Sequence, residues 1–308
     1  MKNYLFPILF LAIIGVAVWY LSRRTAFIFG CKPTWFYIGY ALLLFTTFVF
    51  TFGGASAWTN NAVGHILFCI FSTLLGVLLY LLLIMILADI VQLFAHFPPR
   101  VFGAIVGILT AVVCTGGIVN AFVPRLTPVT VELPNLRQPV RAVLLTDTHL
   151  GHFRGRTHVQ RLVNKINQAQ PDLIFFTGDC FESPYNLNIR TVEPFRQLNA
   201  PVGDATIESV SKELIRKGDL PVVVLHHNPC GGQYLEKAGV DLYLAGHTHG
   251  GQLYPLIWIN DKVFRFNRGL YRLSNMQVYT SCGSGTFGPP MRLGTRSEIT
   301  VMEMRPEK

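Results

Sequence analysis

An apolar run ends in two metal-binding residue types in the segment Ala142-Val-Leu-Leu-Thr-Asp-Thr-His-Leu-Gly151. The run predicts a strand that is buried on both faces, as in parallel sheets, because its apolar residues do not alternate with polar ones. Asp147 and His149 follow directly behind the carboxyl end of this strand. Open α/β sheets place their binding and catalytic sites at such ends. We therefore expect a functional site here.

The same pattern recurs behind three further apolar runs. These runs lead into Asp179, His227 and the pair His247 and His249. Carboxylate oxygen and imidazole nitrogen are donors that Zn, Mn and Fe share. Taken singly, such residues have structural explanations, since an Asp after a strand can cap the next helix and an Asp after a Gly can occupy a turn. Their joint occurrence at four strand ends favours a metal site.

Strands alternate with helices in the second half of the chain, which is the pattern of an α/β layered domain. We expect strands at 140–146, 172–177, 221–226 and 241–245. Helices are expected near 157–169, 188–199, 205–217 and 231–239. Beyond Gly250 the sequence is rich in turns, and short strands at 277–281 and 297–304 predict a second sheet. We assign residues 125–139 to a linker with a short edge strand and 140–308 to this domain.

The first 124 residues have a different composition. Four long stretches contain no charged side chain and approach the length of about 20 apolar residues that a helix needs to cross a bilayer. We expect transmembrane spans at about 4–22, 35–53, 65–88 and 101–123. The first span is not a signal peptide, because its apolar run is long and three further spans follow it. Asp89 lies at the end of the third span, where contact with the interface explains it, so the spans predict an anchor rather than a transporter.

Basic residues in the loops predict the orientation of these spans. The loop after the first span contains Arg23, Arg24 and Lys32, the second loop contains none, and the third contains Arg100. Short loops rich in Lys and Arg stay in the cytoplasm. Both termini and the α/β domain are therefore expected outside the cytoplasm. Basic residues also follow the last span, but the rule gives little weight to charges in a translocated domain.

The overall charge and the cysteines narrow the functional classes. The formal net charge is +9, which suits anionic lipid headgroups or phosphate-bearing substrates. No basic run carries interleaved aromatic residues, so nucleic acid is not an expected partner. The cysteines of the α/β domain, Cys180, Cys230 and Cys282, show neither paired spacing nor Cys-x-x-Cys. We expect them to be small packed residues.

The motifs resemble those of the calcineurin-like metallophosphoesterases, in particular their membrane-anchored bacterial branch. The family pattern runs Asp-x-His, Gly-Asp, Gly-Asn-His, a lone His before Pro, and Gly-His-x-His. The stretch Leu244-Ala-Gly-His-Thr-His-Gly-Gly-Gln252 matches that branch nearly residue for residue. The tail also matches, in Gly269-Leu-Tyr271, Ser281-Cys-Gly-Ser-Gly-Thr286 and Pro290-Met-Arg292. The resemblance covers roughly Val129 to the C-terminus, and it implies a two-sheet α/β domain, which would follow the four-helix transmembrane region predicted from the apolar stretches.

The resemblance also implies a metal-dependent phosphoester hydrolase. It assigns all six residues as metal ligands: Asp147, His149 and His249 for one ion, Asp179 as the bridge, and His227 and His247 for a second ion. Asp179 and His247 would also be catalytic. Two ions about 3.5–4 Å apart can clamp a phosphoryl group and activate a hydroxide that attacks phosphorus. The implied cofactors are one or two Mn, Zn or Fe ions per chain, and the implied substrate is a phosphoester.

One family motif is missing. No Gly-Asn-His occurs in the chain, and Gly203 runs straight into a segment that predicts an amphipathic helix up to Lys217. We expect the strand that carries the motif to be deleted, which leaves the second ion three protein ligands unless Asp204 substitutes. His226 should point away from His227, because neighbouring residues of a strand face opposite sides. The alternative to an active enzyme is therefore an impaired pseudoenzyme that binds a phosphorylated ligand or partner.

The connection between the last span and the first strand of the domain is short. Only about 15 residues separate them, and each extends the chain by at most about 3.3–3.6 Å. The site therefore stays within tens of Å of the lipid headgroups. A lipid-linked or envelope phosphoester suits this position better than a soluble metabolite.

Overall fold

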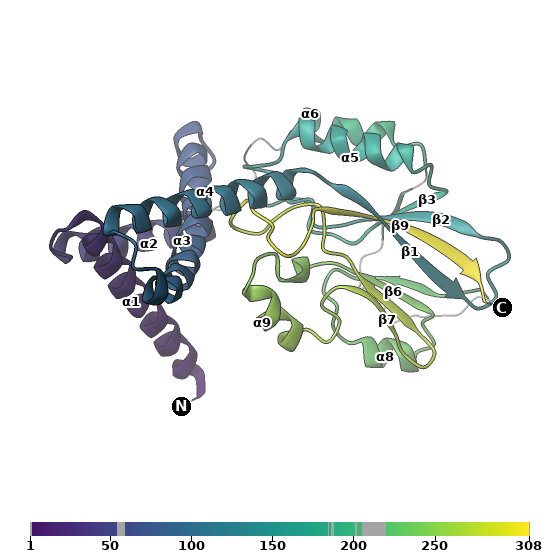
Figure 1. Ribbon diagram of the computed structural model, residues 1–308. Coiled ribbons are helices and arrows are strands. Elements are labelled where there is room, and N and C mark those ends of the chain that lie inside the picture. The colour runs from purple at the N-terminus through teal and green to yellow at the C-terminus, as the bar shows by residue number, and fades with distance from the viewer. Residues whose placement is uncertain are drawn as a thin grey trace. The chain divides into compact units, whose positions relative to one another are not determined.

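The computed structural model describes residues 2–53, 59–183, 185, 188–200, 202–204 and 220–307 (Figure 1). The chain divides into two compact units. The transmembrane unit comprises Met1–Gly54 and Ile66–Gly116, and the unit that the family resemblance predicts to be catalytic, here called the catalytic unit, comprises Ala55–His65 and Gly117–Lys308. The domain boundaries inferred above from composition remain a prediction.

Four helices make up almost all of the first 124 residues: α1 (Lys2–Phe29), α2 (Thr34–Phe52), α3 (Ala62–Ala95) and α4 (Pro99–Phe122). All four are long and apolar enough to cross a membrane. The prediction of four spans is therefore confirmed, and the chain is a membrane protein. The helices are longer than expected, however, because α1 continues past Ser22 and α3 continues past Ala88.

The extra length places two arginines inside a helix instead of in a loop, and one aspartate inside a helix instead of at the end of a span. Arg23 and Arg24 belong to α1, and Asp89 belongs to α3. Arg24 forms an ion pair with Asp89, and the hydroxyl of Tyr20 donates to the same carboxylate at 2.6 Å. A paired charge costs less free energy near the bilayer than an isolated one, so both helices can continue past these charged residues. Of the three basic residues assigned to the first loop, Lys32 alone lies outside a helix, and the outward orientation stays a prediction that protease protection tests.

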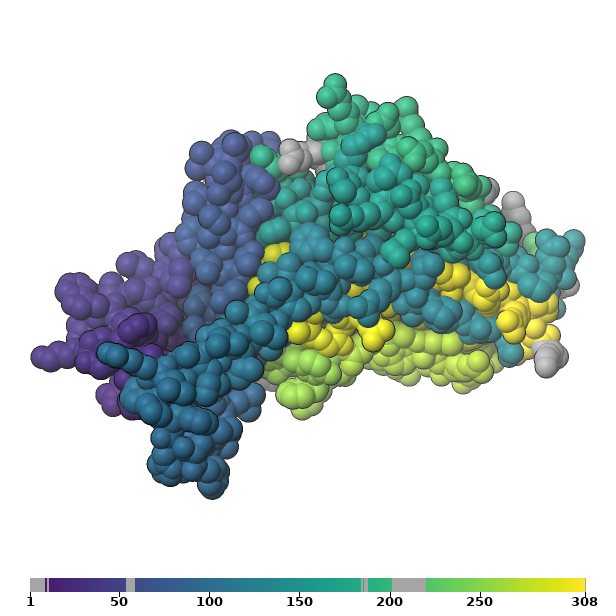
Figure 2. Space-filling model, turned by 45° about the horizontal axis from the view of Figure 1, so that its top comes forward, coloured from purple at the N-terminus to yellow at the C-terminus, as the bar shows by residue number. Residues whose placement is uncertain are grey.

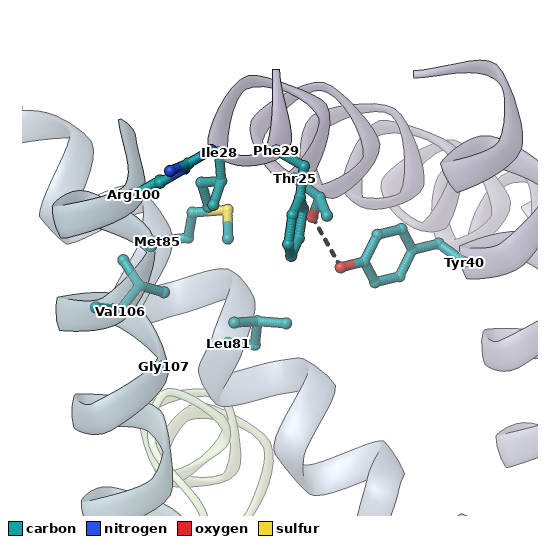
Figure 3. Close-up of a pocket in the computed structure, with 11 residues that line it drawn as sticks. Thr25, Ile28, Phe29, Tyr40, Leu81, Met85, Arg100, Val106 and Gly107 are labelled. Atoms are coloured by element: carbon teal, nitrogen blue, oxygen red, sulfur yellow. Dashed lines mark hydrogen bonds between the residues drawn. The ribbon is translucent and has the colours of Figure 1, made fainter. Parts of the chain in front are cut away.

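A cavity of about 460 Å³ lies among the helices of the transmembrane unit (Figure 3). Each helix contributes to its lining, for example through Thr25, Tyr40, Met85 and Arg100. The hydroxyls of Thr25 and Tyr40 lie 2.9 Å apart at its edge. No acidic residue and no histidine is among the described residues that line it, so this cavity does not provide a metal site.

The catalytic unit contains two sheets. The first has the strand order β1-β9-β2-β3-β4, formed by Arg125–Leu133, Glu298–Pro306, Val140–Leu145, Leu173–Phe176 and Val202–Asp204. The second has the order β5-β6-β8-β7, formed by Val223–Leu225, Leu242–Ala245, Gln277–Thr280 and Gly269–Arg272. Their facing sides share one core, in which Leu144 and Met302 meet Leu244 and Tyr279. Figure 2 shows the yellow C-terminal segment running between the teal and the lime parts of the unit.

Helices cover the outer faces of both sheets (Figure 1). Helix α5 (Arg156–Gln168) packs Leu162 and Ile166 against Val143 and Leu145 of β2. Because Leu144 points into the space between the sheets, β2 is buried on both faces, as its continuous apolar run predicts. Helix α8 (Gly232–Lys237) contributes Leu235 to the cluster on the outer face of the second sheet. The layered α/β fold with two sheets is therefore confirmed.

The partition of strands between the sheets differs from the expectation. Residues beyond Gly250 do not form the second sheet alone, since β5 and β6 pair with β8 there and β9 joins the first sheet. Strand β9 pairs with β1 on one side and with β2 on the other. The strand has nine residues and pairs with both neighbours along much of this length. Its inward residues Met302 and Met304 lie in the shared core.

The strand expected to be deleted is present in a short form. Val202–Asp204 pairs in parallel with β3, with Val202 opposite Ile174, so the expectation of a missing strand is wrong. The helix expected at 205–217 lies outside the described residues. The helix expected near 188–199 consists of α6 (Ile189–Val192) and a 3-10 helix, η2 (Glu193–Gln197). Pro194 explains this break, because it supplies no backbone N–H for a continuing helix.

Candidate metal centre

The six residues chosen from the sequence follow strand ends of both sheets. Asp147 and His149 come after β2, Asp179 after β3, His227 after β5, and His247 and His249 after β6. All but His227 have a positive φ, between 46° and 72°. Non-glycine residues seldom adopt this conformation, and it clusters at functional sites where the surrounding fold enforces it. The backbone at the strand ends is therefore shaped for the site.

Five of the six side chains converge into two overlapping groups. Asp147, His149 and His249 form a buried group, and Asp147, Asp179 and His227 form a more exposed one. Within each group the potential ligand atoms all lie within 4.8 Å of one another. In the buried group His149 Nε2 lies 3.0 Å from His249 Nε2, and His249 Nε2 lies 3.6 Å from Asp147 Oδ1. Such convergent oxygen and nitrogen donors fit a divalent transition-metal ion.

The member common to both groups is Asp147. Its side chain is fully buried, whereas 33% of the Asp179 side chain is exposed. His227 Nε2 lies 3.8 Å from an oxygen of each carboxylate. The resemblance gives the bridging role to Asp179, so the geometry adds Asp147 as a second candidate for that role.

His247 lies at the exposed edge of the centre and belongs to neither group among the described residues. Its ring is 5.0 Å from that of His227, and its backbone N–H donates to both oxygens of Asp147 at 3.1 Å. The glycine before it is required by close packing, because a Cβ at Gly246 would lie 2.2 Å from Asp147 Oδ2. His226 points away from the centre, as expected, and its Nδ1 lies 3.0 Å from the hydroxyl of Tyr243.

Burial and neighbouring charges set the protonation of the ligands. Burial raises the pKa of Asp147, although His227 and the hydroxyl of Thr146 oppose this effect. Burial also raises the pKa of Asp179, but the hydrogen bond and charge of His149 and the other histidines outweigh it and hold that pKa below its ordinary value. Burial, followed by the charges of His149 and Arg292, holds the pKa of His249 well below its ordinary value. A neutral imidazole is the form that binds a metal ion.

One residue whose importance the sequence did not reveal is Arg292. Its fully buried guanidinium donates to the carbonyl oxygens of Cys282 at 2.6 Å and Gly285 at 2.7 Å, among others, and its Nη2 lies 3.0 Å from Nδ1 of His249. Because Nδ1 of His249 faces this arginine, Nε2 faces Asp147. Arg292 therefore orients a candidate ligand, and the Pro290-Met-Arg292 motif gave no indication of that role.

A second unexpected residue is Glu182. Leu150 and Phe181 form an isolated parallel bridge, so His149 and Glu182 project from the same side of this short pairing. Oε2 of Glu182 and Nδ1 of His149 are both buried and lack hydrogen-bond partners within the described part of the chain. Glu182 is thus a further buried carboxylate close enough to the centre to interact electrostatically with His149 and Asp179.

Replacing Glu182 by Gln should make the stability of the metal-free protein less sensitive to pH. Burial raises the pKa of Glu182 from 4.5 to about 7, against the charges of His149 and Arg154. The folded state then binds this proton more tightly than the unfolded state, so stability falls as pH rises from 4.5 to about 7, by roughly 3 kcal/mol. Gln carries no such proton, and the variant should be the more stable protein at pH 8.

Thermal unfolding of chelator-treated protein across this pH range measures the effect. Glu307→Gln is the matched control, because it removes a carboxylate from an exposed position. If the stability of wild type and of Glu182→Gln changed equally with pH, the raised pKa of Glu182 would be contradicted.

Comparison with known proteins gives a consistent set of relatives. The phosphodiesterase YaeI of Escherichia coli K12 is 38% identical, in an alignment that covers 54% of this chain and 82% of that protein. A transmembrane protein with metallophosphoesterase domain from Danio rerio is 28% identical over 64% of this chain and 61% of its own length. An uncharacterized metallophosphoesterase of Campylobacter jejuni is 26% identical over 60% and 64%. The chain thus spans less than two thirds of the last two proteins. No family model and no solved structure matches it.

Proposed function

Because the chain belongs to the metallophosphoesterase family, we propose that it is a membrane-anchored, metal-dependent hydrolase of phosphoesters. The observation that carries the proposal is the convergence of Asp147, His149 and His249 in one buried group, with Asp179 and His227 beside it. A divalent Mn, Zn or Fe ion bound there would polarise a phosphoryl oxygen and lower the pKa of a bound water.

The buried and the exposed residues of the centre would have different roles. The buried group would hold one ion, because Asp147 supplies a carboxylate and His249 an uncharged imidazole away from solvent. Asp179 and His227 are partly exposed and would form the side of the centre that a phosphoester approaches. Asp179 would bridge the ions there. His247, at the exposed edge, is placed to ligate a second ion or to contact the substrate phosphate, and we retain Asp179 and His247 as the catalytic residues.

The substrate is proposed to be a lipid-linked or envelope phosphoester. Helix α4 ends at Phe122 and β1 begins at Arg125, so the connection is shorter than the sequence suggested. Two intervening residues extend the chain by about 7 Å at most. The catalytic unit therefore begins almost where the last span ends, and this supports a substrate within reach of the membrane surface.

Removal and return of metal tests the proposed function. The full chain, purified in detergent, should hydrolyse bis(para-nitrophenyl) phosphate, lose at least about 95% of that activity after chelation, and recover it with Mn, Zn or Fe, since a bound ion would lower the pKa of the attacking water. Elemental analysis should find more nearly one ion than two per chain, because no Gly-Asn-His is present. Activity that survives complete metal removal would refute the proposal. Bound metal without turnover would instead identify a pseudoenzyme.

A further inference from the structure

Large apolar side chains are exposed on and around the eight-residue helix α9 (Leu256–Val263). Trp258 is 63% exposed and Val263 is 67% exposed, while Ile257 on the inner face is fully buried. We call the exposed set the α9 patch: Tyr254, Leu256, Trp258, Ile259, Val263 and Phe287. Soluble surfaces scatter such residues singly, and a contiguous group marks a surface that is covered by something else.

A buried neighbour, Gln252, ties Phe287 to the segment that carries the other members of the patch. The side-chain amide of Gln252 donates to the carbonyl of Phe287 at 3.1 Å and accepts from its N–H at 2.9 Å. The rings of Tyr254 and Trp258 lie 5.4 Å apart. The patch is therefore one surface built from two segments, which the fold holds together.

This surface is continuous with the end of the last transmembrane helix. The N–H of Tyr254 donates to the carbonyl of Leu293 at 3.0 Å. The side chain of Leu293 packs against Gly117, where an added Cβ would lie 3.0 Å from it. The side chain of Asn120 donates to the carbonyl of Arg292 at 2.9 Å. Gly117 and Asn120 belong to the last turns of α4, and these turns are part of the catalytic unit.

Basic residues outnumber acidic ones in the sequence segment that contains α9. Residues 252–272 contain one acid, Asp261, and four basic residues, Lys262, Arg265, Arg268 and Arg272. Apolar residues beside Lys and Arg are typical of helices that lie in the interface of a bilayer, with the apolar face at the acyl boundary and the charges at anionic headgroups.

We propose that the α9 patch docks the catalytic unit onto the lipid bilayer. The inner face of α9 carries the turn that holds His247 and His249, since Asn260 donates to the carbonyl of Thr248 at 3.1 Å and Ile257 packs against Gly251. Docking therefore brings the metal centre to the headgroup level. Given the proposed function, on which this last step rests, the substrate class is a phosphoester of a membrane lipid.

Fluorescence of Trp258 tests the docking without reference to activity. The full chain has four tryptophans, and the substitutions Trp19→Phe, Trp35→Phe and Trp58→Phe leave Trp258 as the reporter. In vesicles of phosphatidylcholine and phosphatidylglycerol in equal parts, lipids brominated on the acyl chain should quench it at least about twofold, and aqueous iodide should quench it little. The matched control carries Trp258→Phe and Tyr234→Trp. Tyr234 is an exposed residue of α8, and a tryptophan there should respond to iodide alone.

Equal responses of the two reporters would overturn the proposal. Protection of Trp258 from iodide without quenching by brominated lipid would also overturn it, because it would place a second copy of the chain on the patch instead of lipid.

A pair of substrates separates failure of the docking from failure of the proposed function. Para-nitrophenyl hexadecyl phosphate is presented in vesicles, and bis(para-nitrophenyl) phosphate is soluble. Replacing Trp258 and Ile259 by Asp should lower the ratio of the first activity to the second at least about tenfold, because charged residues leave the interface. An unchanged ratio counts against the substrate class. Wild-type protein that cleaves neither compound contradicts the proposed function, while the fluorescence result stands on its own.

Discussion

Replacing Asp147 by Ala should abolish metal binding and lower kcat/KM for bis(para-nitrophenyl) phosphate by at least about a thousandfold. Asp147 is the member common to both groups of ligand atoms, and it is the sole carboxylate of the buried group. Its loss leaves the buried group only the imidazoles of His149 and His249, which hold a divalent ion weakly without an anionic partner. Elemental analysis and steady-state kinetics of the full chain in detergent measure both effects.

Two further variants make this result specific. Asp179→Ala should lose activity but keep part of the bound metal, because the buried group remains intact. Asp172→Asn changes an exposed carboxylate outside the centre and should behave as wild type. Greater metal loss in Asp179→Ala than in Asp147→Ala would show that Asp179 is the shared ligand, as the family resemblance implies.

Replacing Arg292 by Met should destabilise the catalytic unit by on the order of 5 kcal/mol, because buried carbonyl groups would lose a charged donor without gaining water. The carbonyls concerned are those of His249, Cys282, Gly283 and Gly285. Arg292→Lys should restore part of the stability, since it keeps the charge but not the planar set of donors. Denaturant unfolding of the full chain, followed by circular dichroism, measures the change.

An arginine four positions away provides the control. Arg296 is exposed on the same loop, so Arg296→Met should change the free energy of unfolding little. Similar losses in the two variants would show that the buried guanidinium does not organise this loop.

The sequence predicted most of the strands well because a buried strand depends on a local pattern. An apolar run such as Val143 to Leu145 leaves few alternatives to a buried strand, and residues behind its end belong to the edge where sites form. Pairing partners are not local. Nothing in the residues of β9 indicates that it inserts between β1 and β2 instead of joining β8, because that choice is made by the shared core.

The features of the centre that could not be predicted depend on residues that are distant in the sequence but close in space. Arg292 and Glu182 are ordinary residues in the sequence, and their roles arise from burial beside His249 and His149. The positive φ values at the ligands are likewise imposed by the tertiary structure, because such a conformation is unfavourable for Asp and His in isolation. The exposure of Trp258 could not be foreseen either, since a short apolar segment predicts burial.

The pairing of β1 with β9 has a consequence for the order of folding. Strand β1 directly follows the membrane anchor, yet all nine of its residues pair with a strand from the far end of the sequence. Contacts between such distant segments form late, because a long loop has to close before they gain any stability. Strand β1 therefore gains its partner only after β9 has formed, so the first sheet is completed by the two strands that lie farthest apart in the sequence of the unit.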